Sequence, residues 1–208
     1  MAHAPHRVAN AARKLPEPVL DGKRSVESAL SRRRSVRDYA GTSLTLDELS
    51  QLLWSAQGIT DAEGLRTAPS AGALYPLETY VVVGDVEGVP SGIYRYRPSG
   101  HALELVVEGD KRPELGDVAL GQECVRDAAA VIAFGGVYGR TTGKYGARGR
   151  RYVHMEAGHA AQNVCLQAVA LDLGTVVVGA FDDRAVKTLA HMAQGEEPLS
   201  LIAVGRPR

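Results

Sequence analysis

The sequence has no excess of charge of either sign and very few cysteines. Its 208 residues contain 24 Lys and Arg against 24 Asp and Glu, so the formal net charge is zero. Nucleic-acid-binding proteins usually carry a clear basic excess, and nucleic acid is therefore not the expected partner. The two cysteines, Cys124 and Cys165, have no close Cys or His partner in the sequence. They predict neither a disulfide framework nor a thiolate metal site.

Long hydrophobic segments are also missing. The longest apolar run, Ala128–Val137, has only about half the length of a membrane span. The first ten residues, Met1–Asn10, lack the apolar core of a secretory signal. We therefore expect a cytoplasmic protein that does not engage a membrane. Its 45% hydrophobic and 23% charged residues are typical of a globular chain, and its length suits one domain.

Hydrophobic periodicity predicts an α+β protein. Residues 1–24 show no periodicity and are interpreted as an N-terminal arm, followed by a single domain over residues 25–208. Apolar residues at helical spacing predict helices at 25–31, 45–58, 152–173 and directly after Asp183. The second of these has a capping box, Thr45 with Glu48. Strands are expected at 79–83, 92–96, 102–108, 128–134, 175–181 and 199–204. A hairpin followed by strands that alternate with helices indicates a mixed central sheet flanked by helices.

The long helix at 152–173 bears on assembly. From Ala157 onward it is apolar nearly all round, a pattern typical of a helix that is buried on every side. Small residues such as Gly158 would also let a second helix approach closely, so burial within one subunit and burial in a dimer interface are both open. One face carries a polar stripe, with Glu156, His159, Asn163 and Gln167. A single Glu-x-x-His is only half of a bundle metal site, so we favour a hydrogen-bonded face and expect no metal.

Four segments carry residues that suit ligand chemistry. Residues 32–37 place four arginines beside Ser35, which can grip a phosphate or form a solvated basic turn. Residues 66–76 are small residues between two prolines, and form either a stiff ligand-facing backbone or a tight loop. Residues 143–151 combine glycines with Lys144, Tyr145 and arginines but lack the Walker pattern, so a mobile loop with proton-transfer groups and a solvated loop are both open. Residues 174–182 are a β-branched strand that ends in Gly179-Ala180, which leaves backbone amides uncovered.

Taken in order, these segments resemble the nitroreductase-like flavoprotein superfamily, and within it the SagB-type, azoline dehydrogenase-like branch. The resemblance covers the chain from about Ser25 to Arg206. It rests on Arg-Arg-Ser-Val-Arg, Thr-Ala-Pro-Ser-Ala-Gly-Ala-Leu-Tyr-Pro, Lys-Tyr-Gly-Ala-Arg-Gly, Glu-Ala-Gly-His-Ala-Ala-Gln-Asn and Val-Gly-Ala-Phe-Asp. It implies a nitroreductase-like α+β fold and an obligate homodimer with two FMN sites at the subunit interface.

The resemblance also implies roles for particular residues. The flavin phosphate, ribityl chain and pyrimidine would be contacted by Arg33, Arg34, Ser35 and Arg37. The isoalloxazine would be lined, from the other subunit, by Pro69, Ser70, Ala71 and Gly72. A backbone amide near flavin N5 would come from Gly179 and Ala180, and Arg206 would complete the phosphate site. Lys144 and Tyr145 match the Lys-Tyr pair that assists substrate deprotonation in SagB-type azoline dehydrogenases.

Elementary chemistry agrees with these roles. A flavin that accepts a hydride gains negative charge near N1, and Arg37 is the candidate cation there. A neighbouring ammonium group favours the phenolate form of a tyrosine, which makes the Lys144-Tyr145 dipeptide a sensible base.

The leading hypothesis is therefore an FMN-dependent oxidoreductase of SagB type, which moves a hydride between a small-molecule or modified-peptide substrate and FMN. One alternative is an NAD(P)H-dependent nitro- or quinone reductase. Another is a flavin-binding protein without turnover, and a nucleic-acid binder is the least favoured.

Overall fold

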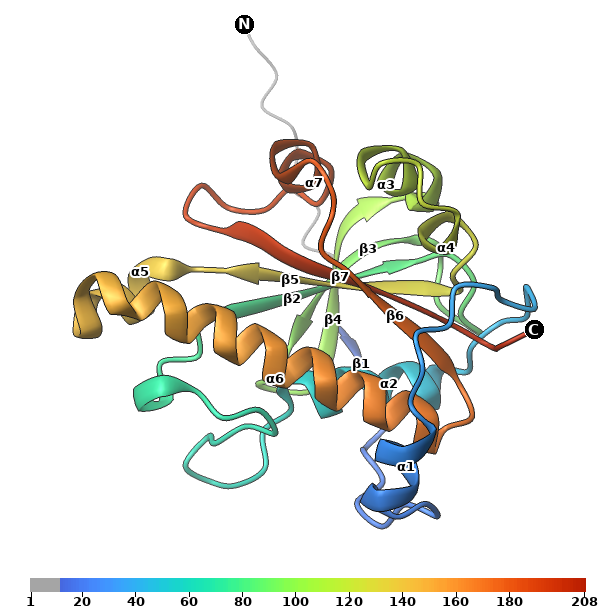
Figure 1. Ribbon diagram of the computed structural model, residues 1–208, viewed down its shortest axis with the longest axis horizontal. Coiled ribbons are helices and arrows are strands. Elements are labelled where there is room, and N and C mark those ends of the chain that lie inside the picture. The colour runs from blue at the N-terminus through green and yellow to red at the C-terminus, as the bar shows by residue number, and fades with distance from the viewer. Residues whose placement is uncertain (1–11) are drawn as a thin grey trace, which may run out of the picture.

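The computed structural model describes residues 12–208 (Figure 1), so the expectation for Met1–Asn10 lies outside the described residues. A seven-stranded sheet forms the centre, in the order β1-β4-β3-β2-β5-β7-β6. Its strands are β1 (Arg13–Lys14), β2 (Leu77–Val83), β3 (Gly92–Arg97), β4 (Ala102–Glu108), β5 (Ala130–Gly136), β6 (Gly174–Val178) and β7 (Glu197–Gly205). The helices are α1 (Val26–Arg32), α2 (Leu46–Gln57), α3 (Arg112–Val118), α4 (Glu123–Arg126), α5 (Tyr138–Tyr145), α6 (Gly149–Ala170) and α7 (Asp183–Leu189). None of the helices in residues 12–208 is long and apolar enough to cross a membrane.

The α+β fold with helices around a central sheet is confirmed, but the sheet is not mixed in the way the sequence suggests. Every pairing between these seven strands is antiparallel. Strands β5 and β6 are joined through helices and run in the same direction, since both pair antiparallel with β7. They are not neighbours, however, because β7 lies between them. Within residues 12–208, parallel pairing occurs only as isolated bridges such as Ser35 with Thr175.

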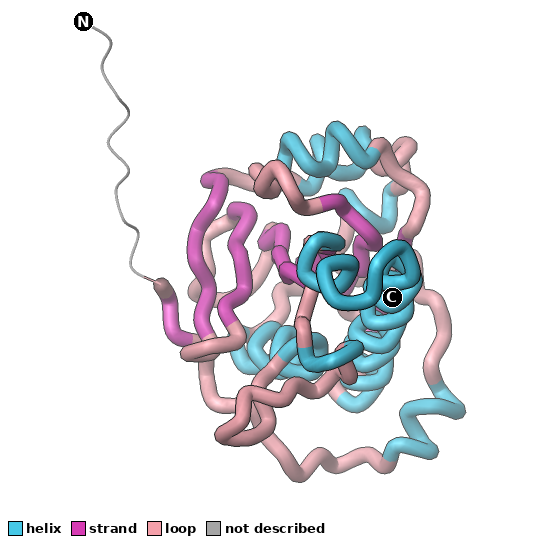
Figure 2. The backbone as a smooth tube through the Cα atoms, turned by 90° about the vertical axis from the view of Figure 1, so that its left-hand side faces the viewer, coloured by secondary structure: helices cyan, strands magenta, loops and turns pink. Residues whose placement is uncertain are grey.

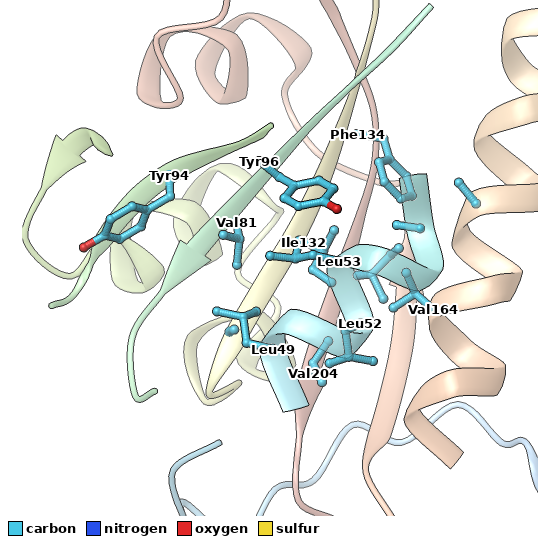
Figure 3. Packing of buried hydrophobic residues seen from close by; sticks show 14 of the residues in the cluster. Leu49, Leu52, Leu53, Val81, Tyr94, Tyr96, Ile132, Phe134, Val164 and Val204 are labelled. Carbon is cyan, nitrogen blue, oxygen red and sulfur yellow. The ribbon is translucent and has the colours of Figure 1, made fainter. Parts of the chain in front are cut away.

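Helices cover both faces of the sheet, with α2 and α6 on one face and α3, α4 and α7 on the other (Figures 1 and 2). Successive strand residues point to opposite faces, and the core is divided accordingly. In β2, Val81 packs in the cluster under α2 and α6, whereas Tyr80 and Val82 pack in the cluster under α3 and α7. In the first cluster the α2 leucines face Val81, Ile132 and Val204 (Figure 3).

Helix α2 follows the prediction closely. The Thr45 hydroxyl accepts a hydrogen bond from the Glu48 amide at 3.2 Å, and the Glu48 carboxylate accepts one from the Thr45 amide at 2.8 Å. Helices α3, α4 and α5 have no counterpart in the prediction, because they are only seven, four and eight residues long and have no side-chain N-cap. Short uncapped segments leave too few turns for a periodic pattern.

Two segments differ from expectation in burial. Helix α6 is not buried on every side, since its exposed residues include Met155, Gly158 and His159. The second part of the N-terminal arm packs against the domain: β1 pairs with β4, and the Leu15 side chain is buried.

Candidate functional site

The side chains of Lys144 and Tyr145 converge on the turn at Gly72, within one chain. A Cβ atom at Gly72 would lie 2.8 Å from the Tyr145 hydroxyl oxygen and 2.9 Å from Lys144 Nζ. Lys144 Nζ also lies 5.5 Å from the centre of the Tyr145 ring. Neighbours in sequence are therefore neighbours in space here, and we call Gly72, Lys144 and Tyr145 the Lys-Tyr cluster.

The Gly72 turn has an unusual backbone. Gly72 has a φ of 65°, and two non-glycine residues close to it, Ala73 and Tyr75, also have positive φ values of 53° and 45°. A non-glycine residue in this conformation costs of the order of 1 kcal/mol or more and tends to occur where function requires it. Ser70 holds the turn together: its carbonyl accepts from the Ala73 amide at 3.1 Å, and its hydroxyl accepts from the Tyr75 amide at 2.9 Å.

Helix α5 is anchored to the same turn from the other side. The Arg140 guanidinium donates to the Tyr75 carbonyl at 2.8 Å and forms an ion pair with Glu78. The Tyr145 ring packs edge-on against Tyr152 of α6, with ring centres 5.2 Å apart. Lys144 and Tyr145 thus sit at the end of a short helix that is tied to the turn they contact.

Glu156 lies buried behind this turn. Only 2% of its surface is exposed, and its Oε1 atom has no hydrogen-bond partner among the described residues. Burial raises the pKa of Glu156 to about 7, against smaller opposing effects of the Ser70 hydroxyl and the Arg66 guanidinium. The sequence marks Glu156 only as part of a polar stripe; the signal for its role is a carboxylate among the buried residues of α6, which are otherwise apolar.

The other residues of the polar stripe do not share one environment or one hydrogen-bond network. Asn163 donates to the Thr67 carbonyl at 3.2 Å, and Gln167 accepts from Gln51 at 3.4 Å. His159 is exposed. Asn163 and Gln167 also line a cavity of about 690 Å³ between residues 19–26, α2 and α6. None of the predicted site residues lines that cavity.

The arginines of residues 33–37 form a second group, which we call the guanidinium cluster: Arg33, Arg34, Ser35 and Arg37. Its backbone is fixed to β6, since the Val36 amide donates to the Thr175 carbonyl at 2.9 Å. Arg34 donates to the carbonyls of Ser31 and Arg33. In residues 12–208 no salt bridge joins these three arginines to a carboxylate. The cluster therefore presents cations suited to a phosphate.

Gly179 and Ala180 follow β6 and are exposed. Nothing lies within 4 Å of the position a Cβ would take at Gly179, so its peptide is open to a flat ligand. The Ala180 carbonyl is already engaged, because it accepts from Gln122 Nε2 at 3.0 Å.

Arg206 lies beside the guanidinium cluster, but its side chain is occupied. The Arg206 carbonyl accepts from the Ala40 amide at 2.9 Å, which places it next to the segment that follows Arg37. Its guanidinium binds both Glu48 oxygens, at 2.9 and 3.0 Å. A phosphate would compete with Glu48 for this arginine.

The two clusters lie at opposite ends of α6. Lys144 and Tyr145 directly precede its N-terminus, whereas Gly174, which packs against Val36, closely follows its C-terminus. A helix of 22 residues spans about 33 Å, so one chain does not close both clusters around one small molecule. Figure 1 shows α5 and α1 at the two ends of this helix.

Comparison with known proteins identifies the family. The nitroreductase family model matches residues 30–206. The chain belongs to the nitroreductase family. It is 49% identical, over 181 residues, to the nitroreductase homologue MJ1384 of Methanocaldococcus jannaschii, covering 87% of this chain and 90% of that protein.

Solved structures agree with this assignment. A nitroreductase homologue of Ralstonia eutropha superposes with a TM-score of 0.84 at 30% identity, over 97% of this chain and 91% of the other. One of Anabaena variabilis gives a TM-score of 0.81 at 35% identity, over 92% of this chain but only 40% of the other. The chain is accordingly an oxidoreductase by family.

Two more distant matches concern peptide systems. The trifolitoxin operon protein TfxC of Rhizobium leguminosarum bv. trifolii is 26% identical over 90% of this chain, which spans 55% of TfxC. The E. coli microcin synthetase McbBCD complex, solved with truncated pro-MccB17 bound, contains a chain that shares the fold at a TM-score of 0.74 and 23% identity, over 100% of this chain and 84% of that one.

Proposed function

We propose that this member of the nitroreductase family binds FMN and works as a homodimer. Proteins of the family generally use FMN, and the residues present suit it: guanidinium groups at 33–37 that form no salt bridge within residues 12–208 for the phosphate, and an open peptide at Gly179 for the ring. Because the guanidinium cluster and the Lys-Tyr cluster lie at opposite ends of α6, a second copy of the chain is needed to bring both to one ligand. The exposed face of α6, with Gly158, suits close contact with that copy.

The reaction we propose is a SagB-type dehydrogenation. The observation that carries it is the convergence of Lys144 and Tyr145 on the Gly72 turn. When bound, FMN supplies an acceptor for a hydride from a substrate carbon. Tyr145 acts as a phenolate, the form that the Lys144 ammonium beside its ring favours; its oxygen takes the accompanying proton and becomes a neutral phenol. Two C–H bonds of the substrate break, a ring double bond forms, the electron pair leaves with the hydride and the proton stays on Tyr145.

The substrate class follows from these residues and from the distant matches. Lys144 is exposed and Tyr145 half-buried, so the pair can be reached by a group carried on a larger molecule. TfxC belongs by name to a toxin operon, and the McbBCD structure holds a peptide precursor. We therefore propose an azoline-like ring in a modified peptide as the substrate.

A second candidate function is an NAD(P)H-dependent nitro- or quinone reductase. It is favoured by the higher identity to MJ1384, which is named as a nitroreductase. In this direction a nicotinamide delivers the hydride, and Tyr145 returns a proton to the acceptor.

Purified protein tests the proposal. We expect a yellow dimer with a flavin absorption band, and Arg33→Ala to lose FMN while Arg184→Ala, at an exposed arginine of α7, retains it. Tyr145→Phe should keep FMN and lose oxidation of a peptide azoline. Tyr138→Phe, the same change on the same helix, is the matched control and should keep both.

Other outcomes assign the alternatives. Rapid bleaching of the flavin by NADPH, with azolines unreacted, would assign the reductase function. A yellow protein inert to both would be a flavin-binding protein without turnover. A colourless monomer that does not take up added FMN would overturn the proposal.

A further inference from the structure

Glu156 is a buried acid to which neither the family resemblance nor the proposed reaction assigns a role. It comes from the middle of α6, where the helix passes behind the Gly72 turn, and is 2% exposed. A carboxylate removed from water is normally hydrogen-bonded or paired, because its desolvation is costly. Glu156 forms no salt bridge in residues 12–208, and its Oε1 has no hydrogen-bond partner there. Such an acid is rare unless its charge state serves a purpose.

The groups that face Glu156 come mainly from the loop of the candidate site. The Ser70 hydroxyl and the Arg66 guanidinium both favour its ionised form. Arg66 is itself half-buried, stacks on the Tyr75 ring at 4.3 Å and donates to Gln57 at 2.8 Å. Further charged or titratable groups around this pair are Glu78 of β2, Arg140 of α5, and Tyr152 and His159 of α6.

Ser70 links this acid to the Lys-Tyr cluster. Its hydroxyl and carbonyl oxygens accept the two backbone hydrogen bonds that shape the turn, from Tyr75 and Ala73. Gly72 lies inside this turn and contacts Lys144 and Tyr145. A change in the acceptor of the Ser70 hydroxyl hydrogen bond therefore shifts the backbone at Gly72, two residues away. The side chains of Lys144 and Tyr145 contact this backbone.

We infer that Glu156 is a positioning residue of this site. Gain or loss of a proton by Glu156 changes its interactions with Ser70 and Arg66. These interactions control how the Gly72 turn is held against Lys144 and Tyr145. Ionised Glu156 attracts the Ser70 hydroxyl and the Arg66 guanidinium, and protonated Glu156 releases both. Burial raises the pKa of Glu156 to about 7, so both forms are populated at neutral pH. The catalytic consequence rests on the proposed function, whereas the coupling between Glu156 and Tyr145 does not.

The test uses the full-length protein without substrate. With 13C-labelled tyrosine ζ-carbons, Tyr145→Phe assigns the Tyr145 resonance among the eight tyrosines. We expect this resonance to move between pH 5 and 9 with a midpoint near 7. Glu156→Gln, which keeps the shape but cannot ionise, should abolish the movement. Glu156→Asp should restore a titration at a shifted midpoint, which a merely structural role would not produce.

His159→Gln is the matched control. His159 lies three residues from Glu156 on the same helix and is exposed, and histidines as a class change charge near neutral pH. The Tyr145 titration should persist in this variant. The inference is overturned if the Tyr145 resonance does not move with pH in the wild type. It is also overturned if the resonance titrates in Glu156→Gln as it does in the wild type. If Glu156→Gln does not fold, Glu156→Asp decides: an unshifted midpoint or an absent titration overturns it.

Failure of this inference is separate from failure of the proposed function. Absence of flavin or of turnover would leave the Tyr145 titration intact. If the Tyr145 resonance did not move with pH in a yellow, active dimer, only the positioning role of Glu156 would be excluded.

Discussion

The Tyr145 hydroxyl occupies the space in which a side chain at position 72 would begin, 2.8 Å from where a Cβ atom would stand. Two segments distant in sequence thus depend on each other: the turn must carry glycine for Tyr145 to lie where it does. This relationship unites the Pro-Ser-Ala-Gly segment and the Lys-Tyr dipeptide, which the sequence shows only as separate motifs.

The first prediction concerns this contact. Gly72→Ala should destabilise the fold by about 1 kcal/mol, because alanine is strained at a φ of 65°, and should also displace the ends of Tyr145 and Lys144. We expect substrate oxidation to fall by about tenfold or more, since misplacement of a reacting group has this order of effect, with FMN retained. Gly64→Ala is the control: its φ is 84°, but nothing lies within 4 Å of the new methyl group. Equal losses of turnover in both variants would contradict a specific role for the Gly72 contact.

The second prediction concerns stability and pH. The pKa of Glu156 is raised in the folded protein from 4.5 to about 7, so the fold binds this proton more tightly than the unfolded chain does. The resulting stabilisation is fully present below about pH 4.5 and is lost progressively as the pH rises to about 7, by at most roughly 3 kcal/mol. In Glu156→Gln this loss should vanish. Urea unfolding at pH 5, 6, 7 and 8 measures it, and parallel curves for the variant and the wild type would show that Glu156 does not titrate in this range.

The third prediction concerns Arg206. Its guanidinium binds Glu48, which also caps α2 through the Thr45 amide. Glu48→Gln should weaken the hold on Arg206 while preserving the cap, because glutamine serves at this position of a capping box. We expect FMN to bind severalfold more tightly in this variant, with little change in Tm, as measured by flavin fluorescence titration. Arg206→Ala is the companion variant, and unchanged FMN affinity in it would remove Arg206 from the phosphate site.

The fourth prediction concerns the core that carries α2. Leu52 is fully buried in the cluster shared with α6 (Figure 3), and Leu52→Ala should cost about 2–5 kcal/mol. Leu30→Ala, on the exposed side of α1 with 55% of the residue accessible, should cost far less. Chemical denaturation of the two variants gives the comparison. Similar losses in both would mean that the packing around α2 is looser than described.

Local patterns predict much of this fold. Thr45 and Glu48 mark the start of α2 because a capping box involves only residues three positions apart. The run of β-branched and aromatic residues at 79–83 predicts a buried strand, because strand preference is a property of those residues themselves. The order of motifs was also sufficient to indicate the family. By contrast, α3 to α5 escaped prediction, because short helices without side-chain caps are stabilised by what they pack against.

The sequence by itself determined the helices with strong caps, six of the seven strands and the family to which the chain belongs, because spacing and chain order are carried by neighbouring residues; β1, in the N-terminal arm, was not predicted. Only the tertiary structure decided that Gly72 meets Lys144 and Tyr145, that Arg206 is held by Glu48, and that Glu156 is buried with its Oε1 atom lacking a hydrogen-bond partner among residues 12–208. It also showed that one side of α6 is left uncovered in a single chain. Each of these depends on which distant surfaces are brought together and withdrawn from water, and no local pattern encodes that.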